Sequence, residues 1–122
     1  METWLQSSDL SAREFGADLS TVIAALQDHD WLAEETLEHQ RSDAGQVSCP
    51  AGLGLVREDG RILHICPNAS GALVHFHHPS RALGFLWRVQ RIRSNLNVPH
   101  GRLVELIELF FEHRDTQIKA IV

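Results

Sequence analysis

Residues 46–78, QVSCPAGLGLVREDGRILHICPNASGALVHFHH, constrain the fold more than any other part of the chain. Two short apolar runs, Leu53–Val56 and Arg61–Cys66, flank the sequence Arg-Glu-Asp-Gly. An Asp-Gly pair between β-prone runs favours a tight hairpin, because glycine accepts a positive φ that other residues resist. A third run, Gly71–His77, follows a turn-like Pro-Asn-Ala-Ser stretch. The pattern predicts three antiparallel strands that form a meander.

Successive side chains of a strand point to opposite faces, so the meander sorts its residues into two sets. The apolar set, which we expect to be buried, consists of Leu63, Ile65, Val74 and Phe76. The set predicted to share the opposite face consists of His64, Cys66, His75 and His77. This prediction assumes a register, and a slip of one residue would move His75 and His77 to the other face.

The second set offers the thiolate and imidazole groups that bind Zn²⁺. The candidate metal ligands are Cys49, Cys66, His64, His75 and His77. No C-x2-C pair is present, so each ligand would have to come from a different strand or turn. The alternative interpretation is two buried thiols beside a row of half-exposed histidines.

Each cysteine is followed by proline, in Cys49-Pro50 and Cys66-Pro67. These dipeptides are similar to the Cys-Pro of haem-regulatory motifs, which implies a thiolate that coordinates ferric haem. Proline after a strand also ends the hydrogen-bond ladder, because it has no N–H to donate. Zinc and haem are therefore two cofactor hypotheses, beside the simpler expectation of no cofactor.

Length and composition predict a single soluble domain, residues 1–122. Hydrophobic residues make up 43% of the chain and charged residues 22%, which is ordinary for a globular protein. The first residues show neither the basic nor the apolar region of a signal peptide, and no apolar run approaches the ~20 residues that span a bilayer. Two cysteines without a secretory signal indicate reduced thiols and a cytoplasmic protein.

The net charge of −5 hides a division along the chain. Residues 1–60 carry three basic and twelve acidic residues, a net −9, and residues 61–122 carry eight basic and four acidic residues, a net +4. Lys119 is the single lysine, so the positive charge is almost wholly guanidinium, which suits recognition of carboxylates or phosphates. The arginines either pair with Glu34, Glu35 and Glu38, within the monomer or across a dimer, or form a patch for an anionic partner.

Residues 1–45 are predicted to be acidic and helical after a short lead of nine residues. Ser11-Ala12-Arg13-Glu14 is similar to a capping box. Amphipathic spacing predicts a helix that begins near Asp18 or Ser20, and a further helix after Asp28 or Asp30.

Residues 11–26, SAREFGADLSTVIAAL, look like a helix-turn-helix, which implies binding to DNA. The second helix offers only Ser20 and Thr21 for phosphates or base edges. Because the surrounding half of the chain is acidic, it would also repel phosphates. A helical hairpin packed on the sheet is the preferred interpretation.

Residues 79–122 are predicted to be helical, basic at first and then acidic. A helix from about Arg81 to Asn95 would bury one apolar face, which includes Ile92 and continues to Leu96, and expose arginines on the other. The candidate partner-binding residues on its exposed side and flank are Arg81, Arg88, Arg91, Trp87 and Leu83. A last helix is expected over about 102–114, and alternation over 116–122 favours a short edge strand.

The expected fold is α+β, with N-terminal helices, a three-stranded antiparallel β-meander and two C-terminal helices packed on the sheet. The chain contains no P-loop, no G-x-G-x-x-G and no G-x-S-x-G, so we lean towards a non-enzymatic role. We predict a small cytoplasmic regulatory or adaptor protein that binds another protein and forms a homodimer. Two alternatives stay open: a metal- or haem-binding sensor that uses the Cys/His face, and a nucleic-acid-binding regulator that uses the arginine face or residues 11–26.

Overall fold

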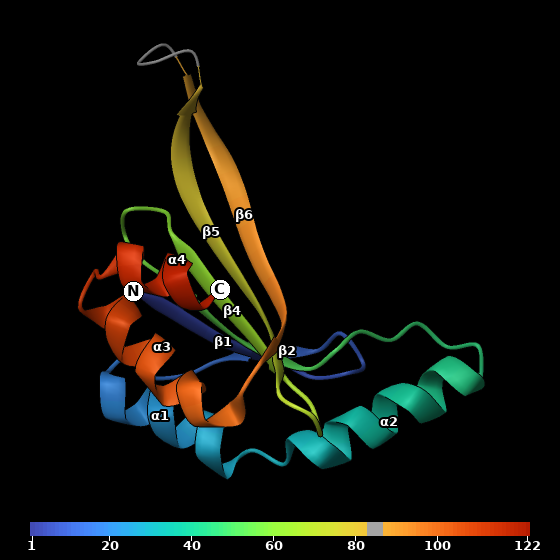
Figure 1. Ribbon diagram of the computed structural model, residues 1–122. Helices are drawn as coiled ribbons and strands as arrows, with labels where there is room; N and C mark the ends of the chain where they lie inside the picture. Colours follow the sequence, from blue (N-terminus) through green and yellow to red (C-terminus); the bar gives the residue numbers. More distant parts are fainter. Residues whose placement is uncertain (83–86) are drawn as a thin grey trace.

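The computed structural model describes residues 1–82 and 87–122, and the side chains of residues 1–79 and 90–122. The described residues form a six-stranded antiparallel sheet in the order β2-β1-β3-β4-β5-β6, together with four α-helices (Figure 1). The strands are β1 (Glu2–Gln6), β2 (Ala12–Glu14), β3 (Gly52–Val56), β4 (Ile62–Pro67), β5 (Ala72–Ala82) and β6 (Trp87–Val98). The helices are α1 (Leu19–Asp28), α2 (Trp31–Asp43), α3 (Leu103–Phe111) and α4 (Asp115–Ile121), with the 3-10 turn η1 (His100–Arg102) before α3.

The prediction of a three-stranded sheet is wrong, because the meander is only the centre of a wider sheet. Its three strands are present as β3, β4 and β5, and the turn between the first two contains Gly60 at φ +86°. The assumed register is confirmed, since Leu63 is paired with Phe76, and His64 with His75. What the sequence analysis missed are the strands on either side, β1 and β2 at one edge and β6 at the other.

The nine-residue lead and the capping-box segment are strands, not the lead and helix expected from the sequence. In β1 the side chains of Thr3 and Leu5 are buried in alternation with their neighbours, and the strand pairs with β3 along its whole length. Ala12–Glu14 forms β2 and pairs with Trp4–Gln6, so the helix-turn-helix resemblance fails at its first helix. The two later helices are present as α1 and α2, and the side chains of Asp18 and Asp30 cap their N-termini.

The helix predicted over residues 81–95 is wrong for the residues that the structure describes, because 81–82 lie in β5 and 87–95 in β6, whereas 83–86 lie outside the described residues. The apolar spacing of this segment fits a helix, but Arg91-Ile92-Arg93 also alternates as a strand does, and pairing with β5 decides between them. The segment predicted as an edge strand, 116–122, lies in helix α4 up to Ile121. Ile118 and Val122, four residues apart, are both buried, which is the spacing of one helix face.

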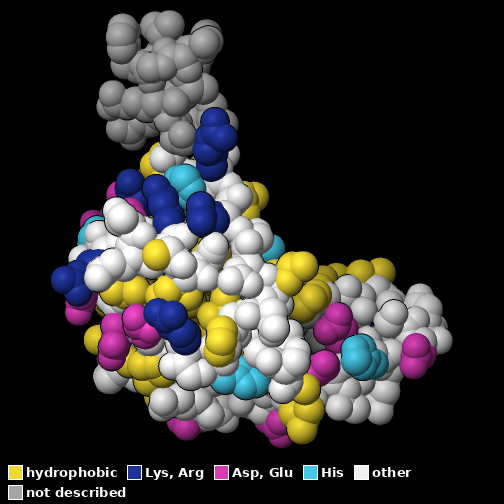
Figure 2. All heavy atoms as spheres, viewed as in Figure 1, with side chains coloured by type: hydrophobic (Ala, Val, Ile, Leu, Met, Phe, Trp, Pro, Cys, Tyr) yellow, Lys and Arg dark blue, Asp and Glu magenta, His cyan; other side chains and the backbone are white. Residues whose placement is uncertain are grey.

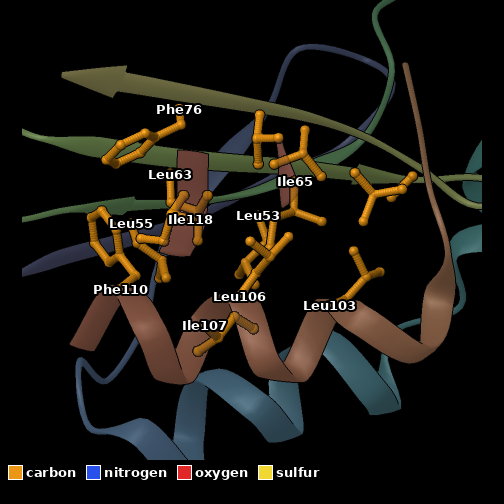
Figure 3. Close-up of a cluster of buried hydrophobic side chains, with 14 of the residues drawn as sticks. Leu53, Leu55, Leu63, Ile65, Phe76, Leu103, Leu106, Ile107, Phe110 and Ile118 are labelled. Carbon is orange, nitrogen blue, oxygen red and sulfur yellow. The ribbon is translucent and has the colours of Figure 1, made fainter. Parts of the chain in front are cut away.

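The hydrophobic core lies between one face of the sheet and helices α1, α3 and α4 (Figure 3). Helix α3 supplies the largest share of the helical side chains, and the rings of Phe110 and Phe76 pack edge to face with their centroids 6.4 Å apart. The labelled core residues in Figure 3 are Leu53, Leu55, Leu63, Ile65, Phe76, Leu103, Leu106, Ile107, Phe110 and Ile118. Within the described residues, no helix has the length and apolar character needed to cross a membrane.

A buried arginine joins the β3–β4 turn to the junction between α3 and α4. Arg57 is 3% exposed and donates hydrogen bonds to Asp59, at 3.1 Å, and to Asp115, at 3.0 Å. It also donates to the carbonyl of Phe110, and its guanidinium lies 4.7 Å from the centre of that ring. The buried charge is therefore paired with two half-buried carboxylates and a carbonyl, and a buried arginine is tolerated only when it is paired in this way.

Candidate functional site

The side of the sheet that faces away from α1, α3 and α4 carries the predicted Cys/His residues, and we call it the open face. Leu63, Phe76 and their apolar neighbours point into the core, so the residues between them point the other way. One row of register partners crosses the sheet on this side, from Trp4 in β1 to Ser94 in β6. The residues of the open face that matter below are Trp4, Gly54, Ile62, His64, Cys66, Leu73, His75, His77, Ile92, Ser94 and Leu96.

The indole ring of Trp4 packs against Gly54. A Cβ built at Gly54 would overlap the ring atoms of Trp4, so only glycine leaves room for this packing. The indole in turn lies 5.0 Å from the ring of His64, and His64 lies 5.9 Å from His75. Because position 54 has no side chain, the Trp4 ring can pack directly against β3 and lie beside the ring of His64.

Cys66 and His64 are in contact, with Sγ 3.3 Å from Nε2. Burial raises the pKa of the Cys66 thiol to about 12, with smaller contributions from Cys49 and Glu38. Burial also lowers the pKa of His64 to about 4, and the neighbouring His75 and His77 add to this effect. Both groups are therefore neutral near pH 7, and the contact lacks the thiolate that a cysteine nucleophile requires.

The predicted metal ligands are only partly brought together. Cys66, His64 and His75 are neighbours on the open face, and His77 stands one register row further along β5. Cys49 lies in the loop before β3, where its Sγ is 3.6 Å from the carbonyl oxygen of Ser7. Within residues 1–82 and 87–122, no three His, Cys, Asp or Glu side chains are grouped so as to hold a metal ion.

At the β6 end of the open face, polar and apolar side chains alternate. The Nδ1 atom of His75 is 2.6 Å from the hydroxyl of Ser94. Ile92 is the register partner of His77 and is 60% exposed. The register shifts between Ala72 and Val74, so that positions 96 and 97 stand opposite Leu73, and Leu96 is 77% exposed.

The predicted partner-binding residues do not share a helix face. Arg81 and Arg88 are register partners near the end of the β5–β6 hairpin, and Trp87 is the partner of Ala82. Arg91 is exposed and is paired with His78, whereas Leu83 lies outside the described residues. Sequence analysis placed Ile92 and Leu96 on a buried helix face and so missed them as surface residues. The alternation in Arg91-Ile92-Arg93 is the pattern that could have revealed them.

Two hollows flank the end of the sheet near α2. The larger, of about 560 Å³, lies between the α1–α2 junction, the β4–β5 turn and the start of α3, with Trp31 and Leu103 in its apolar wall and His29 and His100 among its polar groups. The smaller, of about 280 Å³, lies between α2 and the open face. Its lining includes the carboxylates of Glu34, Glu35 and Glu38, together with Cys66 and Leu73 of the open face.

Comparison with known proteins identifies no relative of this chain. No protein-family model, no curated protein and no solved structure matches this chain.

Proposed function

We propose that this protein acts by binding another protein, as a small regulatory or adaptor protein, and that the open face is its contact surface. The observation that carries the proposal is the exposure of Ile92 and Leu96, at 60% and 77%, on a sheet face that α1, α3 and α4 leave uncovered. We further propose that the first partner is a second copy of the chain.

The physical support is the chemistry of the solvent side of the sheet. An antiparallel sheet with one wet face normally places polar residues on that face. Here the alternating positions instead include Trp4, Ile62, Ile92 and Leu96, and the intervening histidines are neutral imidazoles where their pKa is lowered, as at His64 and His77. Large apolar side chains exposed on one face in this way typically mark an interaction site.

The test is the self-association of a variant that makes the β6 part of the open face polar. Sedimentation equilibrium of the wild type should show a dimer, and I92S/L96S should dimerise about ten-fold more weakly or worse, because two apolar side chains no longer leave water. The matched control is L10S/L19S, which changes two exposed leucines outside the sheet face and should leave the dimer unchanged.

A photo-crosslinking residue at position 96 separates self-association from binding to a different protein. A crosslinked product of twice the chain mass supports the homodimer, and a product of another defined mass supports a different partner. A wild-type chain that is monomeric, and that yields no product specific to position 96 when compared with position 19, would contradict the proposal.

A further inference from the structure

We infer that the helix side of the sheet holds a binding site for a small compound with two or three linked phosphate groups, at the point where β4 ends and β5 and β6 continue alone (Figure 1). The site, which we call the basic cluster, consists of Arg61, His78, Arg91, Arg93 and Lys119. It lies on the side of the sheet opposite the open face. It therefore goes beyond the proposed protein-binding role and does not depend on it.

The register of the sheet places the strand residues of the basic cluster on the helix side. Arg93 is the partner of Phe76, which is buried in the core. Arg91 is the partner of His78, two residues further towards the end of the hairpin, so both point to the same side as Phe76. Continuing the β4–β5 register by one pair brings Arg61 next to His78. A row of Arg61, His78 and Arg91 thus crosses three strands, with Arg93 beside it.

The His78 ring lies at the centre of this row, at the margin of the core. It stacks on the ring of Phe76, with 5.5 Å between the centroids. Burial lowers the pKa of His78, and the charges of Lys119, Arg61 and Arg91 lower it further. The three cations therefore lie close enough to the imidazole to act on it, although they come from α4, from the residue before β4 and from β6.

Helix α4 borders the basic cluster. Arg93 donates a hydrogen bond of 3.1 Å from Nε to the carbonyl oxygen of Val122, directly after the helix. Lys119 lies one turn earlier in α4 and is half-buried, whereas Arg91 is exposed. Because these cations sit on a sheet and a helix that pack together, their positions are fixed by the fold.

The nearest carboxylates are balanced by two other contacts. Asp59 and Asp115 each pair with both Arg57 and Arg61, at distances from 2.6 to 3.1 Å. Two arginines thus offset two carboxylates, and Arg61 adds no net charge to the basic cluster.

The remaining cations have no such balance. Among the described residues, no carboxylate side chain lies within ion-pair distance of Arg91, Arg93 or Lys119. The basic cluster therefore presents three positive charges to solvent around a histidine that can take up a proton.

The glutamates that the sequence suggested as partners for the arginines lie at the other end of β5. Glu35 of α2 accepts a hydrogen bond of 2.9 Å from the backbone of Ala69, in the β4–β5 turn, and Glu34 lies 3.2 Å from His29. Figure 2 shows Lys and Arg side chains gathered at the base of the hairpin around a His side chain, with most of the visible Asp and Glu further away. Of the two roles that the sequence left open for the arginines, the basic cluster favours binding to an anion.

The chemistry and size of the basic cluster favour linked phosphates. Guanidinium and ammonium groups bind phosphate oxygens through charged hydrogen bonds. Each phosphate carries about 1.5–2 negative charges at pH 7, so two of them match three cations and a protonated histidine. Alternate residues of a strand are about 7 Å apart and a row over three strands spans about 10 Å. Hydrogen bonds to a single phosphate, at about 2.8 Å, would not reach all of these groups.

A nucleic-acid strand carries the same phosphate groups, but the basic cluster is small for it. A footprint of about 7 Å by 10 Å is far below the ~600–1,000 Å² that a single DNA-binding module buries. Residues 1–60 carry a net charge of −9, which would repel a long polyanion. A small oligophosphate is therefore the ligand that the observations favour.

The test is isothermal titration calorimetry with inorganic pyrophosphate and inorganic triphosphate. We expect saturable binding of one ligand per chain, at least about ten-fold tighter than the binding of inorganic phosphate. In R91Q/K119Q the affinity for pyrophosphate should fall at least about ten-fold, because two of the three unbalanced charges are gone. In an NMR titration of the wild type, the backbone amide signals of residues 78, 91 and 119 should shift.

The matched control is R102Q/R114Q, which removes the same charge from two exposed arginines that pair with Glu105 and Glu112. It should bind pyrophosphate as the wild type does. R91K/K119R keeps both charges of the basic cluster and should retain most of the affinity. If R91Q/K119Q does not fold, the NMR titration of the wild-type chain decides, because it needs no variant.

The inference is overturned if neither pyrophosphate nor triphosphate binds with a dissociation constant below about 10 mM. It is also overturned if R91Q/K119Q and R102Q/R114Q lose affinity equally, or if the amide shifts lie elsewhere. A single-stranded DNA of about 20 nucleotides is the last arm, and binding of this strand without binding of pyrophosphate would assign the basic cluster to nucleic acid instead. I92S/L96S leaves the basic cluster intact and should bind pyrophosphate normally, so this inference and the proposed self-association can fail separately.

Discussion

At the scale of single residues, the contact between Gly54 and Trp4 determines how closely a ring can approach the sheet. A side chain at position 54 would occupy the space of the indole, so we expect G54A to lower the free energy of unfolding by about 1–3 kcal/mol, as overpacking does. Chemical denaturation measures this directly. G101A is the control, because a Cβ at Gly101 meets no atom within 4 Å, and it should stay within about 0.5 kcal/mol of the wild type.

A double-mutant cycle identifies why G54A lowers the free energy of unfolding. In a chain that already carries W4A, the space above Gly54 is free, and adding G54A should cost much less than it does in the wild type. An equal cost in both backgrounds would show that the indole is not what the new methyl group displaces.

The burial of His64 leads us to expect a second effect at the residue scale, which is a dependence of the free energy of unfolding on pH. Burial, reinforced by His75 and His77, lowers its pKa in the folded chain to about 4, against about 6.5 for an ordinary histidine. The unfolded chain therefore binds more protons between these two values, and the free energy of unfolding should fall as the pH drops from about 6.5 to about 4. The loss is at most about 3 kcal/mol.

Urea denaturation at several pH values checks this prediction. H64Q cannot titrate and should flatten the decline over that pH range, whereas H39Q, which changes an exposed histidine of α2, should keep it. A decline that is equally steep in the wild type and in H64Q would assign the pH dependence to other groups.

At the scale of elements, Arg57 ties the β3–β4 turn to the start of α4. Removing it in R57A would leave Arg61 as the one cation that Asp59 and Asp115 share, and would remove the charged hydrogen bonds of a buried guanidinium, at a cost of about 2–3 kcal/mol. We expect this loss in the free energy of unfolding, together with faster amide hydrogen exchange in α4. R102A is the comparison, because its pair with Glu105 is exposed and should contribute about 1 kcal/mol or less. Similar losses in the two variants would contradict a structural role for the buried pair.

Prediction from sequence succeeded for some of the helices and strands and failed for others. The strands β3 and β4 carry their own turn signal, Asp59-Gly60, and helices α1 and α2 carry their own caps, so local sequence was sufficient for them. The residues of β6 fit a helix and a strand about equally well, and only pairing with β5 favours the strand. Residues 116–122 were misassigned for the converse reason, since Ile118, Ala120 and Val122 alternate in sequence although Ile118 and Val122 share one helix face.

At the scale of the whole molecule, the helices of the core lie on one side of the sheet and leave the other side open (Figure 1). The proposed self-association belongs to this scale, since it would cover the apolar residues that the monomer leaves in water. Because the dimer would be favoured by mass action, the melting temperature should rise with protein concentration in the wild type and much less in I92S/L96S.

The sequence by itself determined the mixed α+β class, the central meander with its register and the two faces of that meander. These follow from turn chemistry and from the alternation of residues a few positions apart, which are properties of the local chain. Tertiary structure alone decided the six-stranded width of the sheet, the strand character of β1, β2 and β6, and the exposure of Ile92 and Leu96. Each of these depends on which distant segment supplies the pairing partner, and sequence periodicity does not contain that information.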